Sequence, residues 1–275
     1  MGLYTDIETN ATLIKDEHIP ILDKTGVRIG ISLDSIDECY HNYVRGNKEA
    51  YSLTLKTIKK LAMNNMQDRM VILTSLCPEN EEKYDELVNY LHDSYGIFYY
   101  KVNPIIPIGR AATLSEGKLY SVIDRIRISN MCNELSKKYK VCVSIGLPPA
   151  LCESKEQLAT ITTGCAFKNL LSVYPNGDIT TCTCGNISFP KKYGNIKQQT
   201  LNEILSGDLY RKVLSDLDND ITGICGQCIY YKYCKGGCRM EAALYGSDGL
   251  RSPLPLCQQA YEHGLFPESK TITKL

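Results

Sequence analysis

The sequence predicts an α/β protein in which stacked βα units are followed by a small cysteine-rich domain. Short β-rich runs alternate with stretches of helical periodicity up to about residue 164, which is the pattern of βα units. Eight of the 13 cysteines then lie between residues 165 and 257. The 275 residues are 43% hydrophobic and 23% charged, which is typical of a globular chain.

Five runs in the first part are predicted to be strands because they are short, apolar and rich in β-forming residues. They are Leu3–Thr9, Val27–Leu33, Met70–Ser75, Phe98–Asn103 and Val141–Ile145. Between them, three stretches repeat apolar residues at helical spacing. These stretches begin at Tyr51, at Tyr84 behind Pro78, and at Leu119, and the last runs to about Tyr139. Their apolar stripes are expected to face the core.

Polar residues directly follow three of the predicted strands. They form the runs Thr9–Thr12, Ser32–Ser35 and Asn103–Arg110. The carboxyl ends of parallel strands lie at one edge of a sheet, where the loops surround a common crevice. Each run alone is also typical of turns and helix caps. Because all three fall at the same predicted edge, this edge is the candidate site of the first part.

Charge and hydropathy exclude several classes of protein. The 31 basic residues balance the 31 acidic ones, so the net charge of zero gives no electrostatic footprint for nucleic acid or an anionic membrane. No apolar run approaches the ~20 residues that a bilayer span needs. The first residues have neither the basic nor the apolar region of a signal peptide. We therefore expect a cytoplasmic protein that binds neither nucleic acid nor a membrane.

The cysteines divide into scattered and clustered sets. The odd count and the absence of a secretory signal argue against a disulfide framework. Five scattered cysteines are expected to pack as small apolar residues, namely Cys39, Cys77, Cys132, Cys142 and Cys152. The other eight are Cys165, Cys182, Cys184, Cys225, Cys228, Cys234, Cys238 and Cys257. Among them, Asn176-Gly177 predicts a hairpin turn and Leu201–Leu217 predicts a helical interval.

Short steps of two, five and three residues separate Cys225, Cys228, Cys234 and Cys238, so several thiolates can converge on one centre. Thiolates bind zinc or iron–sulfur clusters. Structural zinc takes about four ligands, often as two short pairs, and Cys225–Cys228 is the clearest such pair. Seven or eight thiols exceed one tetrahedral site and match the ~eight ligands of two four-iron clusters. We therefore favour iron–sulfur clusters; a structural zinc-binding protein and thiol–disulfide exchange at Cys225-x2-Cys228 are the alternatives.

The pattern Cys165-x11-Gly177-x4-Cys182, then Cys225-x2-Cys228-x5-Cys234-x3-Cys238 and Cys257, resembles the SPASM domain of radical S-adenosylmethionine enzymes. In the first part, Thr9–Ile14, Ile31–Arg45 and Asn103–Ala111 are similar to the barrel of the same family, with Ala11 where the family has glycine. The resemblance covers nearly the whole chain. It implies a partial (β/α)6 barrel, similar to a TIM barrel, without its first strand at residues 1–150. A linker at 151–164, a SPASM domain at 165–263 and a tail at 264–275 would follow.

The resemblance also implies ligand sets for two auxiliary [4Fe–4S] clusters. One set is Cys165, Cys182 and Cys238, with Cys184 or Cys152 as the candidate fourth ligand unless that position is open for substrate. The other set is Cys225, Cys228, Cys234 and Cys257. The rim residues that would lie near S-adenosylmethionine are Asn10, Ser32, Asp34 and Asn103.

One motif of the family, the Cys-x3-Cys-x2-Cys that ligates the catalytic cluster, is absent from the 275 residues, and Glu241 stands at the third place after Cys234-x3-Cys238. The chain therefore resembles the C-terminal part of such an enzyme and is expected not to generate radicals as given. The full-length enzyme would hold S-adenosylmethionine and a third four-iron cluster, and would modify a peptide or protein through a 5′-deoxyadenosyl radical. Its electron donor would be a flavodoxin or ferredoxin. The alternative is a degenerate, non-catalytic iron–sulfur scaffold or peptide-binding partner.

Overall fold

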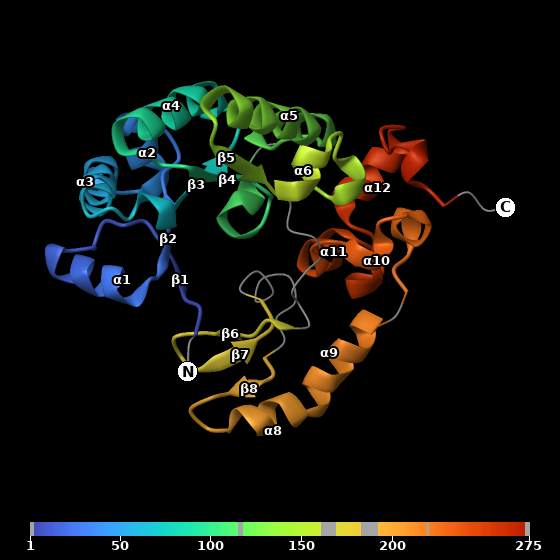
Figure 1. Cartoon of the computed structure of the whole chain (residues 1–275). Coiled ribbons are helices and arrows are strands. Elements are labelled where there is room, and N and C mark those ends of the chain that lie inside the picture. The colour runs from blue at the N-terminus through green and yellow to red at the C-terminus, as the bar shows by residue number, and fades with distance from the viewer. Residues whose placement is uncertain (1–2, 115–117, 161–168, 183–191, 219, 273–275) are drawn as a thin grey trace. The chain divides into compact units, whose positions relative to one another are not determined.

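The computed structural model describes residues 3–114, 118–160, 169–182, 192–218 and 220–272 of the chain (Figure 1). These residues divide into two compact units. Unit 1 comprises Met1–Leu147 and Ser154–Ile161, and unit 2 comprises Pro148–Glu153 and Thr162–Leu275. The segment that we expected to be a linker, 151–164, therefore contributes residues to both units, and the predicted domain borders stay predictions.

Unit 1 is built on a parallel sheet of five strands in the order β1-β2-β3-β4-β5. The strands are β1 (Asp6–Thr9), β2 (Arg28–Ser32), β3 (Met70–Leu76), β4 (Tyr99–Pro104) and β5 (Cys142–Ile145). Each lies within three residues of a predicted strand. The predicted α/β class is thus confirmed, and the order of strands is that of consecutive βα units.

Helices connect these strands and lie along the outer side of the sheet (Figure 1). They are α1 (Ile19–Thr25), α2 (Glu38–Arg45), α3 (Ala50–Met63), α4 (Tyr84–Tyr95), α5 (Val122–Tyr139) and α6 (Lys155–Thr160). The three predicted helices correspond to α3, α4 and α5. Helix α5 begins where Ser121 accepts a hydrogen bond from the N–H of Asp124, which completes a capping box. Helix α4 begins at Tyr84 because a 3-10 turn, Glu81–Lys83, follows Pro78 instead of a full helical turn.

The two faces of the sheet differ in burial. Along β4, Tyr100 and Val102 are buried while Lys101 and Asn103 are exposed, which is the alternation of a strand with one covered face. The buried residues join a core that includes Ile29, Ile31, Ile72, Leu87 and Ile128. Within unit 1, the helices therefore cover one face, and the opposite face carries the more polar side chains.

Unit 2 contains a three-stranded antiparallel sheet, β6 (Ser172–Val173), β7 (Asp178–Thr180) and β8 (Gly194–Asn195). The predicted hairpin is confirmed, since Ser172 pairs with Thr180 and Gly177 occupies the turn at φ 93°. The predicted helical interval is divided at Gly207 into α8 (Leu201–Ser206) and α9 (Asp208–Asp218). Three further helices follow: α10 (Tyr231–Cys234), α11 (Arg239–Tyr245) and α12 (Pro255–Glu262).

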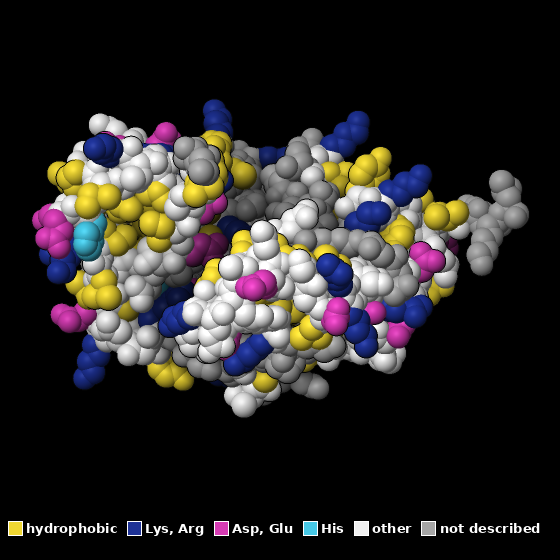
Figure 2. All heavy atoms as spheres, turned by 90° about the horizontal axis from the view of Figure 1, so that it is seen from below, with side chains coloured by type: hydrophobic (Ala, Val, Ile, Leu, Met, Phe, Trp, Pro, Cys, Tyr) yellow, Lys and Arg dark blue, Asp and Glu magenta, His cyan; other side chains and the backbone are white. Residues whose placement is uncertain are grey.

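The charged side chains are scattered in the view of Figure 2, where Lys and Arg alternate with Asp, Glu and uncharged groups. This arrangement fits the net charge of zero. Among the described residues, no helix combines the length and the apolar character needed to cross a bilayer.

Candidate metal centre

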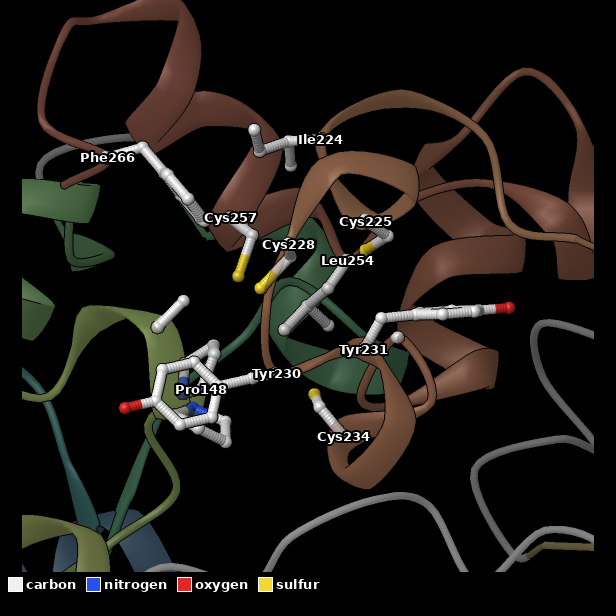
Figure 3. A pocket seen from close by; sticks show the side chains of 13 residues that line it. Pro148, Ile224, Cys225, Cys228, Tyr230, Tyr231, Cys234, Leu254, Cys257 and Phe266 are labelled. Atoms are coloured by element: carbon white, nitrogen blue, oxygen red, sulfur yellow. The ribbon is translucent and has the colours of Figure 1, made fainter. Parts of the chain in front are cut away.

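Four of the predicted ligands, Cys225, Cys228, Cys234 and Cys257, line one pocket of unit 2. Figure 3 shows the sulfur atoms of Cys228 and Cys257 pointing into this pocket, and Cys234 pointing back toward them from the opposite side. The pocket contains about 330 Å³ of space between its lining atoms, including the part open to solvent. The distant Cys257 therefore joins the three cysteines that lie close together in sequence.

Local turns explain how three of these thiols converge. Cys225 lies in a 3-10 turn, Gly223–Gln227, and its carbonyl accepts a hydrogen bond from the N–H of Cys228 at 3.3 Å. The chain then enters α10, whose last residue is Cys234. The spacings of two and five residues thus correspond to one tight turn and one short helix.

Cys257 reaches the pocket from α12. Pro255 occupies the first turn of this helix, where its missing N–H costs no hydrogen bond. Cys257 and Leu256 are buried in the same turn. Helix α12 packs against the 3-10 turn that carries Cys225, and the N–H of Ile224 donates to the Gln258 side chain at 3.1 Å. This packing fixes Cys257 opposite the cysteine-rich turn.

The apolar side of the pocket comes from segments that sequence reasoning missed. Pro148, Pro149 and Ala150 lie at the end of the segment where we expected the barrel, and Phe266 lies in the expected tail. None of these residues has a metal-binding side chain, so no sequence signal marked them. Their contribution to the pocket is a packing effect that only the folded chain reveals.

The tail is also paired with the cysteine-rich turn. The N–H of Ile229 donates to the carbonyl of Lys270 at 3.0 Å, and the N–H of Ile272 donates to Gln227 at 2.6 Å. Cys228 and Thr271 form an antiparallel bridge between the two segments. These backbone hydrogen bonds hold the turn at Cys228 against the tail, which gives residues 268–272 a structural role.

The environment of the four thiols opposes their ionisation. Burial raises the pKa of each of the thiols of Cys225, Cys228, Cys234 and Cys257. The charges of Cys225, Cys234 and Cys228, which line the same pocket, raise the pKa of Cys257 further. Because the thiolate is the form that binds metal, the set is ionised only with a compensating cation between the sulfurs.

The donor set fits an iron–sulfur cluster better than a single ion. Among the described residues, no group of three or more Cys, His, Asp or Glu side chains is placed to hold one metal ion. A zinc ion draws its thiolates to about 2.3 Å from one centre. A four-iron cluster is larger and bonds each thiolate to a different iron, so its ligands stand further apart. Four thiols around one pocket supply the four ligands that such a cluster needs.

The second predicted ligand set is described only in part. Cys165 and Cys184 lie outside the described residues. Cys182 is half-buried directly after β7 and packs against the apolar core of unit 2. Cys238 is exposed at the start of α11, where its Sγ accepts a hydrogen bond from the N–H of Glu241 at 3.4 Å. Their role as ligands stays a prediction.

Cys152, the alternative fourth ligand of that set, is buried, and its Sγ lies 3.6 Å from the carbonyl oxygen of Pro148. Burial raises the pKa of its thiol to about 11, although the charge of Lys270 opposes this shift. Pro148 lines the pocket of the other four cysteines. The structure therefore places Cys152 behind the apolar side of that pocket.

In unit 1, the first predicted cofactor residue, Asn10, follows β1 in a tight turn. Its side-chain oxygen accepts hydrogen bonds from the N–H of Thr12 at 3.2 Å and from the Thr12 hydroxyl at 3.0 Å. Ala11 is fully buried at φ 61°, a left-handed conformation that glycine adopts more easily. The hydroxyl groups of Thr54 and Thr57 donate to the carbonyls of Asn10 and Ala11, which anchors the turn to α3.

Asp34 follows β2 and is 1% exposed, with its carboxylate fully engaged. Arg45 donates two parallel hydrogen bonds to it, at 2.7 and 2.8 Å, and the N–H of Ser75 donates a third at 3.1 Å. The Asp34 N–H donates to Nδ1 of His41 at 3.2 Å. Asp34 thus ties the ends of β2 and β3 to α2.

Burial raises the pKa of the Asp34 carboxylate, but the contact with His41 and the hydrogen bonds and charge of Arg45 outweigh burial and hold the pKa below its usual value. The carboxylate is therefore a fixed negative charge that organises the rim of the sheet. Its contact with S-adenosylmethionine stays a prediction.

Ser32 and Asn103 are carried on the more polar face of the same sheet. Ser32 ends β2, is half-buried and pairs in register with Leu73. Asn103 is exposed on β4 and pairs in register with Ser75, whose N–H donates to Asp34. The structure thus brings Ser32, Asp34 and Asn103 to the carboxyl ends of β2 and β4, the two strands that flank β3, at the one edge where the sequence predicts them for parallel strands.

Comparison with family models matches both units. Residues 1–91 match the radical SAM superfamily, and residues 165–229 match SPASM, described as an iron–sulfur cluster-binding domain. Solved chains of anSMEcpe with bound AdoMet share the fold: one superposes with a TM-score of 0.69 and 18% identity, covering 94% of this chain and 71% of that one. Another anSMEcpe chain, with AdoMet and a Kp18Cys peptide, gives a TM-score of 0.66.

Curated relatives are also similar in sequence, over different shares of their own length. The AdoMet-dependent heme synthase of Nitratidesulfovibrio vulgaris is 24% identical, over 93% of this chain and 71% of the relative. The antilisterial bacteriocin subtilosin biosynthesis protein AlbA of Bacillus subtilis is 24% identical, over 85% of this chain and 50% of the relative. The sporulation killing factor maturation protein SkfB of the same organism is 26% identical over 40% of this chain and 27% of the relative. The chain therefore spans about half the length of AlbA.

The parallel sheet, the cysteine-lined pocket and the two family matches agree with one another. The chain belongs to the radical SAM proteins that carry an iron–sulfur SPASM domain.

Proposed function

We propose that this chain is the SPASM-bearing part of a radical SAM enzyme that modifies a peptide or protein. Two relatives support a peptide substrate, since AlbA is named for bacteriocin biosynthesis and SkfB for the maturation of a killing factor. A solved chain with the same fold holds AdoMet together with a peptide. We expect the enzyme to act in the cytoplasm and to receive electrons from a flavodoxin or ferredoxin.

The observation that carries the proposal is the pocket lined by four cysteines, of which three are buried and Cys234 is half-buried. We assign one four-iron cluster to Cys225, Cys228, Cys234 and Cys257. A second cluster would use Cys165, Cys182 and Cys238, with Cys184 or Cys152 as its fourth ligand. In both sets the protein supplies thiolates, and around the first set the buried apolar side chains of the pocket limit the access of water and influence the potential of the bound cluster.

The sheet rim of unit 1 would hold the adenosyl cofactor near Asn10, Ser32, Asp34 and Asn103. When bound next to a reduced cluster, S-adenosylmethionine supplies the radical that removes a hydrogen atom from the substrate. The Cys-x3-Cys-x2-Cys ligands for that cluster are absent from these 275 residues. We therefore propose that this chain alone binds auxiliary clusters and does not cleave S-adenosylmethionine.

Anaerobic reconstitution of the chain tests this proposal. We expect about eight irons and eight sulfides per chain, in two four-iron clusters. Incubation with S-adenosylmethionine and dithionite should release no 5′-deoxyadenosine. Stoichiometric zinc instead of iron would contradict the cluster assignment, and release of 5′-deoxyadenosine would contradict the proposed inactivity.

A non-catalytic scaffold is the second candidate, favoured by the missing motif. It would bind the same clusters, so metal content does not separate the two. Translation of the nucleotide sequence upstream of the Met1 codon separates the enzyme from the scaffold. An in-frame Cys-x3-Cys-x2-Cys there supports the enzyme, and stop codons in its place support the scaffold.

A further inference from the structure

A buried arginine directly follows Cys238 in the sequence and contacts the turn that begins after Cys234. Arg239 is the first residue of α11 and only 4% exposed. One of its terminal nitrogens donates to the carbonyls of Leu250 at 2.9 Å and Ser252 at 2.8 Å, and the other donates to the carbonyl of Gly236. A guanidinium group stays charged in a protein, so this site holds a permanent positive charge away from water.

The guanidinium group contacts an unusual turn. Between Cys234 and Cys238, the three residues Lys235, Gly236 and Gly237 all have positive φ, at 50°, 76° and 64°. The two glycines adopt this conformation readily, so Lys235 is the one residue of the turn with a strained backbone. Arg239 supports this turn through its hydrogen bonds to Gly236 and, at 3.4 Å, to Gly237. The turn links a ligand of one predicted cluster to a ligand of the other.

The guanidinium group also lies directly behind the cysteine pocket. Gly236 lines that pocket together with Cys225 and Cys234. A Cβ atom at Gly236 would come within 2.6 Å of the Arg239 side-chain nitrogen, so the charge lies next to a residue that lines the pocket.

We propose that Arg239 is a positioning residue that raises the reduction potential of the cluster held by Cys225, Cys228, Cys234 and Cys257. This inference rests on the proposed function. Reduction adds one electron and one negative charge to the cluster. A fixed positive charge in a medium of low dielectric constant stabilises the reduced form more than the oxidised form. Arg239 also holds the turn that presents Cys234.

The test compares substitutions that separate charge from shape. All proteins are full chains that carry Cys165→Ala and Cys182→Ala, so that one cluster signal remains. The variants are Arg239→Gln, which removes the charge, and Arg239→Lys, which keeps it. The matched control is Arg211→Gln, the same change at an exposed position on α9 of the same unit. The midpoint potential is read by redox titration monitored by EPR.

We expect Arg239→Gln to favour the oxidised cluster at least tenfold more than the parent does, which lowers the potential by about 59 mV for one electron. Arg239→Lys and Arg211→Gln should stay close to the parent. An unchanged potential in Arg239→Gln would overturn the inference, and so would an equal drop in Arg239→Lys. If Arg239→Gln binds no iron, Arg239→Lys decides: a potential near that of the parent supports the inference and a tenfold shift overturns it. A parent that takes up no iron refutes the proposed function, whatever the variants do.

Discussion

The ion pair between Asp34 and Arg45 is expected to be the most stabilising charged contact at the sheet rim. Arg45→Met removes the guanidinium group and leaves the Asp34 carboxylate, which is 1% exposed, without its cation. Breaking a buried pair in this way costs about 3–5 kcal/mol. The Arg45 side chain is 27% exposed, so part of its charge is already solvated. We therefore expect a loss near the lower end, about 3 kcal/mol at pH 7.

The loss of stability in Arg45→Met should depend on pH in a defined direction. In the native chain the pKa of Asp34 lies below its usual value. Its contribution to stability is therefore present above the pKa of the unfolded chain, and it disappears as the pH falls through the folded pKa. Without Arg45, the hydrogen bonds and the charge that oppose burial are lost, so the pKa of Asp34 rises relative to the native chain and the carboxylate is protonated at a higher pH. The stability difference between the two chains should shrink as the pH falls from 7 to 4.

The assay is urea unfolding, followed by hydrogen exchange on peptides that cover β2 and β3. With a slope of about 2 kcal/mol per molar urea, a loss of 3 kcal/mol lowers the midpoint by about 1.5 M. The control is Arg69→Met, whose partner Asp23 is 61% exposed, so a loss below about 1 kcal/mol is expected. Equal midpoints for the two variants at pH 7, or a difference from native that does not shrink at pH 4, would refute this reasoning.

Three further predictions concern the backbone and the thiols. Lys140→Gly should raise the thermal midpoint, because exposed Lys140 ends α5 at φ 54° and glycine relieves about 1 kcal/mol of strain; a lower midpoint argues against it. Gly177→Ala should cost more than about 1 kcal/mol and speed hydrogen exchange in the hairpin, since its Cβ would lie 2.7 Å from Oδ1 of Asn195 at φ 93°; unchanged exchange contradicts this. Maleimide at pH 8 should label exposed Cys39 and spare Cys132, because burial raises the pKa of Cys132 to about 12; equal labelling rates measured by mass spectrometry would contradict it.

The sheet could be predicted from the sequence because its signal is local. Buried residues such as Ile29, Ile31 and Ile72 lie within short β-rich runs, and polar residues follow those runs. Helix α1 was missed because it has seven residues and only Ile19 is buried, so its apolar pattern is too short to detect. The turn at Ala11 shows the same limit, since nothing in its local sequence marks the left-handed backbone.

For the candidate centre, the cysteine ligands could be predicted from the sequence, but the residues that surround them could not. The resemblance to SPASM domains implied that Cys257 joins Cys225 and Cys228, and all three line one pocket. By contrast, Pro148 and Phe266 line that pocket through packing across more than 70 residues of chain. Likewise, Asp34 was chosen for its place after a strand, yet its pairing with Arg45 depends on how α2 packs, which spacing does not encode.

The central claim is that Cys225, Cys228, Cys234 and Cys257 hold one iron–sulfur cluster. The most direct measurement is the iron content of the reconstituted double variant Cys225→Ala/Cys257→Ala, beside the native chain and the control Cys132→Ala. We predict that the double variant loses about four of about eight irons while the control loses none. Iron content equal to that of the native chain, at the same far-UV circular dichroism, would contradict the account.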